Sequence, residues 1–227
     1  MPKKTVLITG SCGEIGQALV NILSQDISLK IVTTDLKPLP AGLTGKSTHL
    51  IGNLLDKSFL KEMEDNYQFG QVFHLAAVLS TRAEKDPLLA HQVNTCSTID
   101  LLELASRQSS LTGNSVQFIF PSSIAVYGVP DIKTKNSTPP IKEDQFTEPT
   151  TMYGCSKLYC EKVGVYYSEY FGRLNKELQV RIDFRAVRLP GIISAFTVPD
   201  GGTSDFGPEM IHAAAQGKKY DCFVRPD

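Results

Sequence analysis

The order of apolar runs along the chain restricts its fold more than any other feature of the sequence. Short runs rich in β-branched residues, such as TVLITG and LKIVTTD, alternate with longer amphipathic stretches such as EIGQALVNILSQ and KSFLKEMEDNY. Continuous apolar runs are typical of strands buried on both faces of a parallel sheet, and the stretches between them have the period of helices. The sequence therefore predicts an α/β fold, a doubly wound parallel sheet of Rossmann type.

The alternation continues through the middle of the chain. It predicts a long amphipathic helix over residues 86–107, a strand at VQFIFPSS, a helix over residues 153–171 and a strand in IDFRAVRLPGII. The stretch GVPDIKTKNSTPPIKEDQFTEPTT is rich in Pro, Lys and polar residues, so we expect a surface loop there. PEMIHAAAQ predicts a short helix with Pro208 in its first turn.

The length of 227 residues suits one ordinary domain, or one domain with a fragment of another. We expect an NAD-binding Rossmann domain over residues 1–190 and the start of a substrate-binding region over residues 191–227. The chain stops at CFVRPD without a capped element, which we interpret as a truncation of that region.

Composition excludes several classes of function. A net charge of −1 lacks the basic signature of nucleic-acid binding. No apolar run approaches the roughly 18 residues of a membrane helix, and the start MPKKTVLITG does not resemble a secretory signal, so the expected location is the cytoplasm. The five cysteines show neither CxxC nor a Cys/His cluster at zinc spacing, which favours reduced packing thiols and no metal site.

A glycine-rich turn follows the first predicted strand. In TGSCGEIG, Gly10, Gly13 and Gly16 lie between the strand and the first helix, where backbone N–H groups and the helix dipole can hold a pyrophosphate. Three glycines in a turn are a weak signal alone, because tight turns use glycine anyway. The turn makes these glycines candidate cofactor-binding residues, together with its two intervening residues Glu14 and Ile15.

An acidic residue ends the second predicted strand. Asp35 lies nineteen residues after Gly16, close to the offset of about 20 residues expected for the acid that binds the ribose of NAD. A carboxylate there favours NAD over NADP, although Lys37 keeps NADP possible. After the third strand, Asn53 and Leu54 occupy a place from which a ligand's adenine could be reached, and a plain loop is the alternative.

Tyr153 and Lys157 are four residues apart, so both lie on one face of a helix. A phenol ordinarily titrates near pH ~10, and an adjacent ammonium is expected to lower its pKa enough for it to act as a base. The pattern YxxxK also occurs by chance on solvated helices. Ser122 and Ser123 strengthen the catalytic interpretation, because the fifth strand delivers their hydroxyls to the carboxyl edge of the sheet, where such folds bind ligands.

Together these segments resemble the extended short-chain dehydrogenases/reductases, the NAD-dependent epimerase/dehydratase family. The matching pieces appear in the family's order through about residue 191: TGSCGEIG, Asp35, HLAA, Val93-Asn94, PSSIAVYG, YGCSK and RLPG. The resemblance implies an enzyme in which Ser123 and Tyr153 handle the substrate oxygen and Lys157 holds the nicotinamide ribose and tunes Tyr153. It implies a structural role for His74.

The resemblance also implies further cofactor contacts. Leu75, Ala76 and Ala77 would line the path of the pyrophosphate and ribose, with Asn94 near the site, and Pro190 and Ile192 would face the nicotinamide carboxamide. Helices over residues 86–107 and around Tyr153 would pair in a homodimer. Candidate substrate-binding hydroxyls are those of Ser80, Ser122, Thr203 and Ser204.

Several substrates are compatible with these residues. TMYGCSK, DFRAVRLPGIISA and GGTSDF look most like family members that oxidise the β-hydroxyl of L-threonine with NAD, whereas STRAEKD also resembles sugar-acid dehydrogenases. A nucleotide-sugar epimerase or dehydratase with tightly bound NAD is the alternative enzyme. A non-catalytic NAD-binding regulator is the alternative from another class, and the retained Tyr153, Lys157 and Ser123 argue against it.

Overall fold

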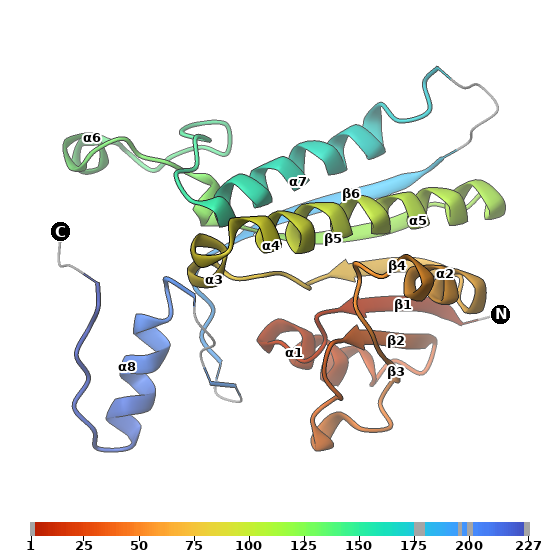
Figure 1. The fold of residues 1–227 in the computed structure, drawn as a ribbon, viewed down its shortest axis with the longest axis horizontal. Coiled ribbons are helices and arrows are strands. Elements are labelled where there is room, and N and C mark those ends of the chain that lie inside the picture. The colour runs from red at the N-terminus through yellow and green to blue at the C-terminus, as the bar shows by residue number, and fades with distance from the viewer. Residues whose placement is uncertain (1–2, 175–179, 195–196, 199–201, 225–227) are drawn as a thin grey trace.

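A six-stranded parallel sheet forms the centre of the protein (Figure 1). The computed structural model describes residues 3–174, 180–194, 197–198 and 202–224. The strand order is β3-β2-β1-β4-β5-β6. Successive strands are added to one side of β1 as far as β3 and to its other side from β4 onward, which confirms the predicted doubly wound fold. The strands are β1 (Lys4–Thr9), β2 (Leu29–Asp35), β3 (Thr48–Ile51), β4 (Phe69–His74), β5 (Val116–Ser123) and β6 (Ile182–Leu189).

Helices cover the two faces of the sheet (Figure 1). One face is packed by α2 (Lys57–Asn66), α5 (Ser97–Thr112) and α7 (Met152–Glu169), and the other by α1 (Glu14–Leu23) and η1 (Ala41–Leu43). The remaining helical elements are α3 (Ser80–Lys85), α4 (Pro87–His91), the π-helical turn η2 (Gln92–Cys96), the 3-10 turn η3 (Ile124–Val126), α6 (Ile132–Ser137) and α8 (Phe206–Ala215).

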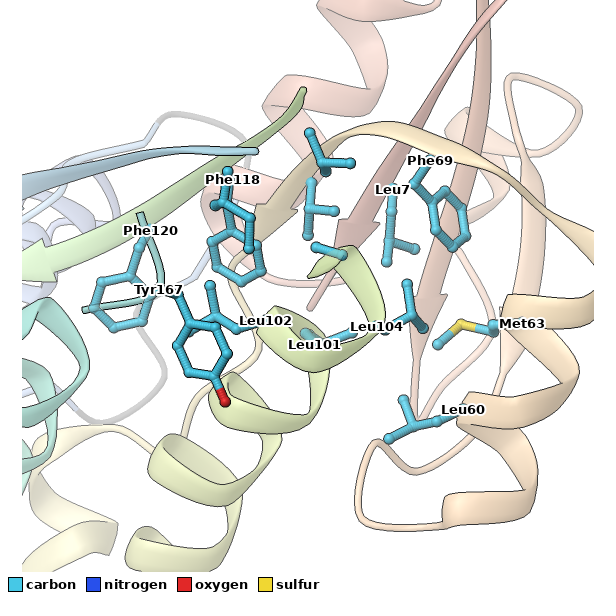
Figure 2. Packing of buried hydrophobic residues seen from close by; sticks show 14 of the residues in the cluster. Leu7, Leu60, Met63, Phe69, Leu101, Leu102, Leu104, Phe118, Phe120 and Tyr167 are labelled. Carbon is cyan, nitrogen blue, oxygen red and sulfur yellow. The ribbon is translucent and has the colours of Figure 1, made fainter. Parts of the chain in front are cut away.

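The larger core lies under α2, α5 and α7 (Figure 2). Phe118 and Phe120 of β5 are almost fully buried and stack against Phe184 of β6. Leu101, Leu102 and Leu104 of α5 pack beneath the strands. At roughly 1.5–3 kcal/mol for each fully buried large apolar side chain, this face is the main source of stability that holds α7 in place.

One predicted helix end was wrong. The helix expected over residues 86–107 continues to Thr112, interrupted by η2, and ends where Gly113 adopts a φ of 70°. Serine and threonine are weak helix formers, but in SRQSSLT the burial of Ser106, Gln108 and Ser109 overrides that preference.

Two short helices were missed. The predicted surface loop contains α6, which starts where the Asp131 side chain accepts a hydrogen bond from the Thr134 N–H. The charged segment STRAEKD forms α3, whose Ala83 is fully buried. In the part of the chain that the structure describes, no helix is long and apolar enough to cross a membrane.

Candidate active site

The glycine turn brings three backbone segments into contact at the carboxyl edge of the sheet. Gly10 has a φ of 64°, and a Cβ there would lie 2.6 Å from the Ala76 nitrogen. A Cβ on Gly16 would lie 2.4 Å from the Gly10 oxygen, so α1 packs directly against the turn. Gly13 is the N-cap of α1 and has no side chain that could cap the helix. The backbone N–H groups of the first turn, at Glu14 and Ile15, are therefore left to bind another acceptor.

Asp35 lies beside this turn, at the end of β2. Its Oδ2 accepts a hydrogen bond from the Cys12 N–H at 2.9 Å, and its Oδ1 accepts one from the Lys37 N–H at 3.4 Å. Burial and the nearby Asp35 carboxylate raise the pKa of Cys12 to about 11, so this thiol stays protonated at neutral pH. The structure thus places the predicted acid next to the predicted phosphate loop.

The residues after β3 differ in how their side chains are placed. Asn53 is exposed, and its Oδ1 accepts a hydrogen bond from the Leu55 N–H at 3.0 Å. Leu54 belongs to the larger core, so its side chain packs away from solvent and only its main chain remains for a ligand.

His74 organises the segment after β4. Its ring is buried between Thr9 Oγ1, 2.8 Å from Nδ1, and Thr98 Oγ1, 3.0 Å from Nε2. Burial, with a smaller contribution from the charge of Lys157, lowers the pKa of His74 to about 3. The histidine is therefore neutral and structural, as predicted. Sequence reasoning missed Thr9, although the register of the sheet pairs it with His74.

Asn94 braces the same segment from η2. Its Oδ1 accepts a hydrogen bond from the Val78 N–H at 2.7 Å, and its Nδ2 donates to the Val78 oxygen at 3.0 Å. Thr9 Oγ1 accepts a further bond from the Ala76 N–H at 3.2 Å. Leu75, Ala76 and Ala77 are thereby held opposite the glycine turn, with the buried Asn94 side chain committed to backbone.

Helix α7 carries Tyr153 and Lys157 in its first two turns. The Thr151 hydroxyl accepts from the Gly154 N–H at 3.1 Å, and Glu84 accepts from the Met152 N–H at 2.7 Å, so the helix start is capped from two elements. Lys157 Nζ donates to the Pro121 oxygen at 2.7 Å and lies 5.5 Å from the centre of the Tyr153 ring. The predicted pair therefore shares one helix face beside β5.

The expected lowering of the Tyr153 pKa is not found. Tyr153 packs against the apolar cluster of Val78, Ala83 and Ala90, and burial raises its pKa to about 12. Burial also lowers the pKa of Lys157 to about 8, against the smaller raising effects of Cys160 and Glu161. The reason is that the ammonium is directed at the Pro121 carbonyl, so desolvation outweighs its effect on the phenol.

The two serines at the end of β5 have different environments. Ser123 is half-buried, and its Oγ accepts a hydrogen bond from the Ala125 N–H at 3.1 Å, which leaves its O–H free to donate. Ser122 is 3% exposed, and its buried hydroxyl has no hydrogen-bond partner among the described residues. Ser123 is therefore the accessible hydroxyl of the pair.

The predicted substrate residues come together in part. The Thr203 N–H donates to Ser80 Oγ at 3.0 Å, and the two hydroxyl oxygens are 3.3 Å apart, which joins α3 to the turn before α8. Ser204 lies beside Gly191, where an added Cβ would be 3.0 Å from the serine Cβ.

Pro190 is exposed and Ile192 half-buried on the segment leaving β6. Among the residues described, no cluster of His, Cys, Asp and Glu could hold a metal ion.

The chain is similar to known proteins over almost its whole length. The model of the NAD dependent epimerase/dehydratase family matches residues 6–226. The mitochondrial L-threonine 3-dehydrogenase of Bos taurus is 29% identical over 99% of this chain and 55% of its own length. An uncharacterized epimerase/dehydratase of Staphylococcus saprophyticus is 32% identical over 99% of this chain and 64% of its own.

A solved structure has the same fold. The GalE-like L-threonine dehydrogenase from Cupriavidus necator, in its holo form, is 33% identical, with a TM-score of 0.80 over 98% of this chain and 66% of that one. The chain thus spans between about half and two thirds of the length of these relatives. The match of the family model over almost the whole chain, with the glycine turn, Asp35 and the Tyr153 helix in their family order, shows that the chain belongs to the NAD dependent epimerase/dehydratase family.

Proposed function

We propose that this chain forms the NAD-binding and catalytic part of a dehydrogenase that oxidises the secondary hydroxyl of a small substrate, with L-threonine as the first candidate. The observation that carries the proposal is the placement of Tyr153 and Lys157 on one face of α7, beside the strand that ends in Ser123. The similarity to L-threonine 3-dehydrogenases supports the choice of substrate.

NAD fits the carboxyl edge of β1, β2 and β4. Gly10, Gly13 and Gly16, with Glu14 and Ile15, would receive the pyrophosphate at the uncapped N-terminus of α1. Asp35 would accept hydrogen bonds from the adenosine ribose. The remaining candidate contacts are those of Asn53, Leu54, Leu75, Ala76, Ala77, Asn94, Pro190 and Ile192. When bound, NAD supplies the hydride acceptor.

The reaction needs one proton acceptor and one oriented alcohol. Ser123 would donate its free O–H to the substrate oxygen, which positions the hydroxyl toward Tyr153. Tyr153 would take the hydroxyl proton while the carbon releases hydride, so that a ketone forms. Lys157, whose Nζ lies 5.5 Å from the centre of the Tyr153 ring, would stabilise the phenolate form that accepts this proton.

An assay for NADH formation tests the proposal. Purified protein given NAD and L-threonine should raise the absorbance of reduced nicotinamide, with production of 2-amino-3-ketobutyrate. Ser80, Thr203 and Ser204 would serve as hydroxyl donors to the carboxylate of L-threonine. A panel of sugar acids tests the second substrate class. If no hydroxy acid in the panel yields NADH, dehydrogenase activity is ruled out.

A nucleotide-sugar epimerase or dehydratase is the second candidate. It is supported by the family description and by the similarity to the Staphylococcus relative. Such an enzyme would return the hydride to the sugar, so it would convert a nucleotide sugar without accumulating NADH. Chromatography of UDP- and GDP-sugars after incubation with protein and NAD separates the two activities.

The glycine turn provides a prediction about cofactor binding. In Gly16→Ala, the new Cβ would lie 2.4 Å from the Gly10 oxygen, so the turn must shift. We expect the free energy of unfolding to fall by about 1–3 kcal/mol and NAD affinity to fall at least about tenfold. Urea unfolding and a fluorescence titration with NAD measure both. Gly42→Ala is the matched control, because its Cβ meets no atom within 4 Å.

We also propose that the chain forms a homodimer through α5 and α7. An exposed stripe along α7 contains Tyr159, 46% exposed, and Tyr166, 49% exposed, at the spacing of one helix face. Light scattering of the wild type should give twice the monomer mass, and Tyr159→Glu should shift the population to monomer. A monomer mass for the wild type over a wide concentration range would contradict this proposal.

A further inference from the structure

A partly buried ion pair joins α7 to β6 directly behind the candidate active site. Arg188 Nε and Nη2 donate to Oε1 and Oε2 of Glu161 at 2.9 and 2.7 Å. The two side chains are only 19% and 11% exposed. The two parallel bonds fix the carboxylate and the guanidinium in one plane, which gives the contact a defined direction as well as attraction.

The same guanidinium binds two further segments. Arg188 Nη1 donates to Tyr127 Oη at 2.8 Å and to the Glu143 oxygen at 2.5 Å. Tyr127 ends the 3-10 turn that begins directly after Ser123, and Glu143 belongs to the loop that leads to α7. One side chain therefore connects β6, α7, the segment after Ser123 and the loop before Tyr153.

Stability alone does not account for this arrangement. Removing two charges from water costs about as much as their attraction returns, and a well-packed apolar pair usually holds two elements equally well. Helix α7 already packs tightly on β6, since a Cβ on Gly164 would lie 2.1 Å from the Phe184 ring. The Arg188 guanidinium additionally fixes the relative positions of the four oxygen atoms that accept its hydrogen bonds.

The pair is also aligned with the catalytic candidates. Glu161 follows Lys157 by four residues and Tyr153 by eight, so all three lie along one side of α7. On the other side of the contact, Arg188 pairs in the sheet with Ser122, the neighbour of Ser123. The ion pair thus links the helix that carries the base with the strand that carries the serine.

We propose that Glu161 and Arg188 are positioning residues of the active site, which hold Tyr153 and Lys157 in register with Ser123 by tying α7 to β6 and to the segment around Tyr127. The role of these residues rests on the proposed function of Tyr153, Lys157 and Ser123. Neither Glu161 nor Arg188 has to touch substrate or cofactor for this role.

Electrostatics support the same assignment. Burial would raise the pKa of Glu161, but the bonds from Arg188 lower it, and the net pKa lies below the usual value, so the carboxylate is ionised at neutral pH. Of the groups near Lys157, the buried thiol of Cys160 and the phenol of Tyr153 both have raised pKa values, and His74 is neutral. Cys160 and Glu161 both favour a charged Lys157 against the effect of burial, and of the two only Glu161 is ionised at neutral pH.

The experiment compares three variants of the intact chain, two double and one single. Glu161→Gln/Arg188→Gln removes both charges and keeps hydrogen-bonding amides, and Tyr127→Phe removes a single hydroxyl from the network. The control is Glu64→Gln/Arg107→Gln, which breaks a bidentate pair of similar geometry, 2.8 and 3.0 Å, between α2 and α5. Its Arg107 is 51% exposed and lies in the C-terminal half of α5.

Steady-state kinetics give the first readout. We expect the Glu161/Arg188 double variant to lower kcat by about 10- to 100-fold and Tyr127→Phe by several fold, because small displacements at a reacting centre have effects of this size. The dissociation constant for NAD should change by less than about twofold, whereas reversible unfolding that lowered kcat this far would raise the apparent constant in proportion. Unchanged kcat, or an equal loss in the control, would overturn the positioning role.

Titration of Tyr153 separates this inference from the proposed function. The near-ultraviolet absorbance of its phenolate, obtained by difference from Tyr153→Phe in each background, requires no turnover. A shifted titration in the Glu161/Arg188 double variant, with an unchanged control, supports positioning even if no substrate is oxidised. The same titration in all backgrounds excludes it, whereas absence of NADH formation by the wild type contradicts only the proposed reaction.

Discussion

Replacing Tyr153 with Phe should lower kcat for alcohol oxidation by about 10²–10⁴-fold, the range that loss of a general base produces. The hydroxyl is the only group lost, and the ring keeps its packing against Val78, Ala83 and Ala90. NAD affinity and the free energy of unfolding should therefore change little. NADH absorbance measures the rate, and a fluorescence titration and urea unfolding measure the other two quantities.

Tyr159→Phe is the matched control for that variant. Tyr159 lies on the same helix but is 46% exposed, and residues two apart on a helix do not share a face, so its hydroxyl is not expected to reach the substrate beside Lys157. Its removal should leave kcat within about twofold of the wild type. If Tyr153→Phe keeps the wild-type kcat, another group accepts the proton of the substrate hydroxyl, and the proposed mechanism is wrong.

Replacing Lys157 with Met should affect both activity and the pH dependence of stability. Lys157 is buried, and its pKa falls from 10.5 to about 8 in the folded chain. The unfolded chain binds more protons than the folded chain between these two values, so stability gained from this residue rises with pH there. Below pH 8 the folded protein carries the full cost of a buried charge.

The expected difference is large enough to measure. Between pH 7 and pH 10, the wild type should gain about 3 kcal/mol in free energy of unfolding relative to Lys157→Met, from a shift of this size. The variant should also lose most of its activity, because the phenolate of Tyr153 loses its cation. Urea unfolding at both pH values measures the first effect. If the stability of the two proteins depends on pH in the same way, burial does not lower the pKa of Lys157.

Most of the site was predictable because parallel strands end at one edge of the sheet. The positions of Gly10, Asp35 and Ser123 follow from strand order and from the alternation of apolar runs with helices. The spacing of Tyr153 and Lys157 likewise follows from the geometry of one helix. These are local properties, so the sequence alone was sufficient to group the candidates.

The errors have long-range causes. The pKa of Tyr153 rises because α7 presses the ring onto residues of α3 and α4, and no spacing within YGCSK reports that burial. Similarly, Glu161 was assigned no role, because its partner Arg188 is 27 residues away and meets it only where α7 packs against β6. Its position four residues after Lys157 is the one signal that could have identified it.

The amino-acid sequence by itself determined the fold class, the family and the set of candidate catalytic residues, because each depends on local period, turn chemistry and spacing. Only the tertiary structure decided the protonation of those residues and the contacts that orient them. Desolvation and hydrogen bonding depend on which segments come together in space, as the Lys157 contact with Pro121 and the Arg188 contact with Tyr127 show. The charge state of this site is therefore a property of packing.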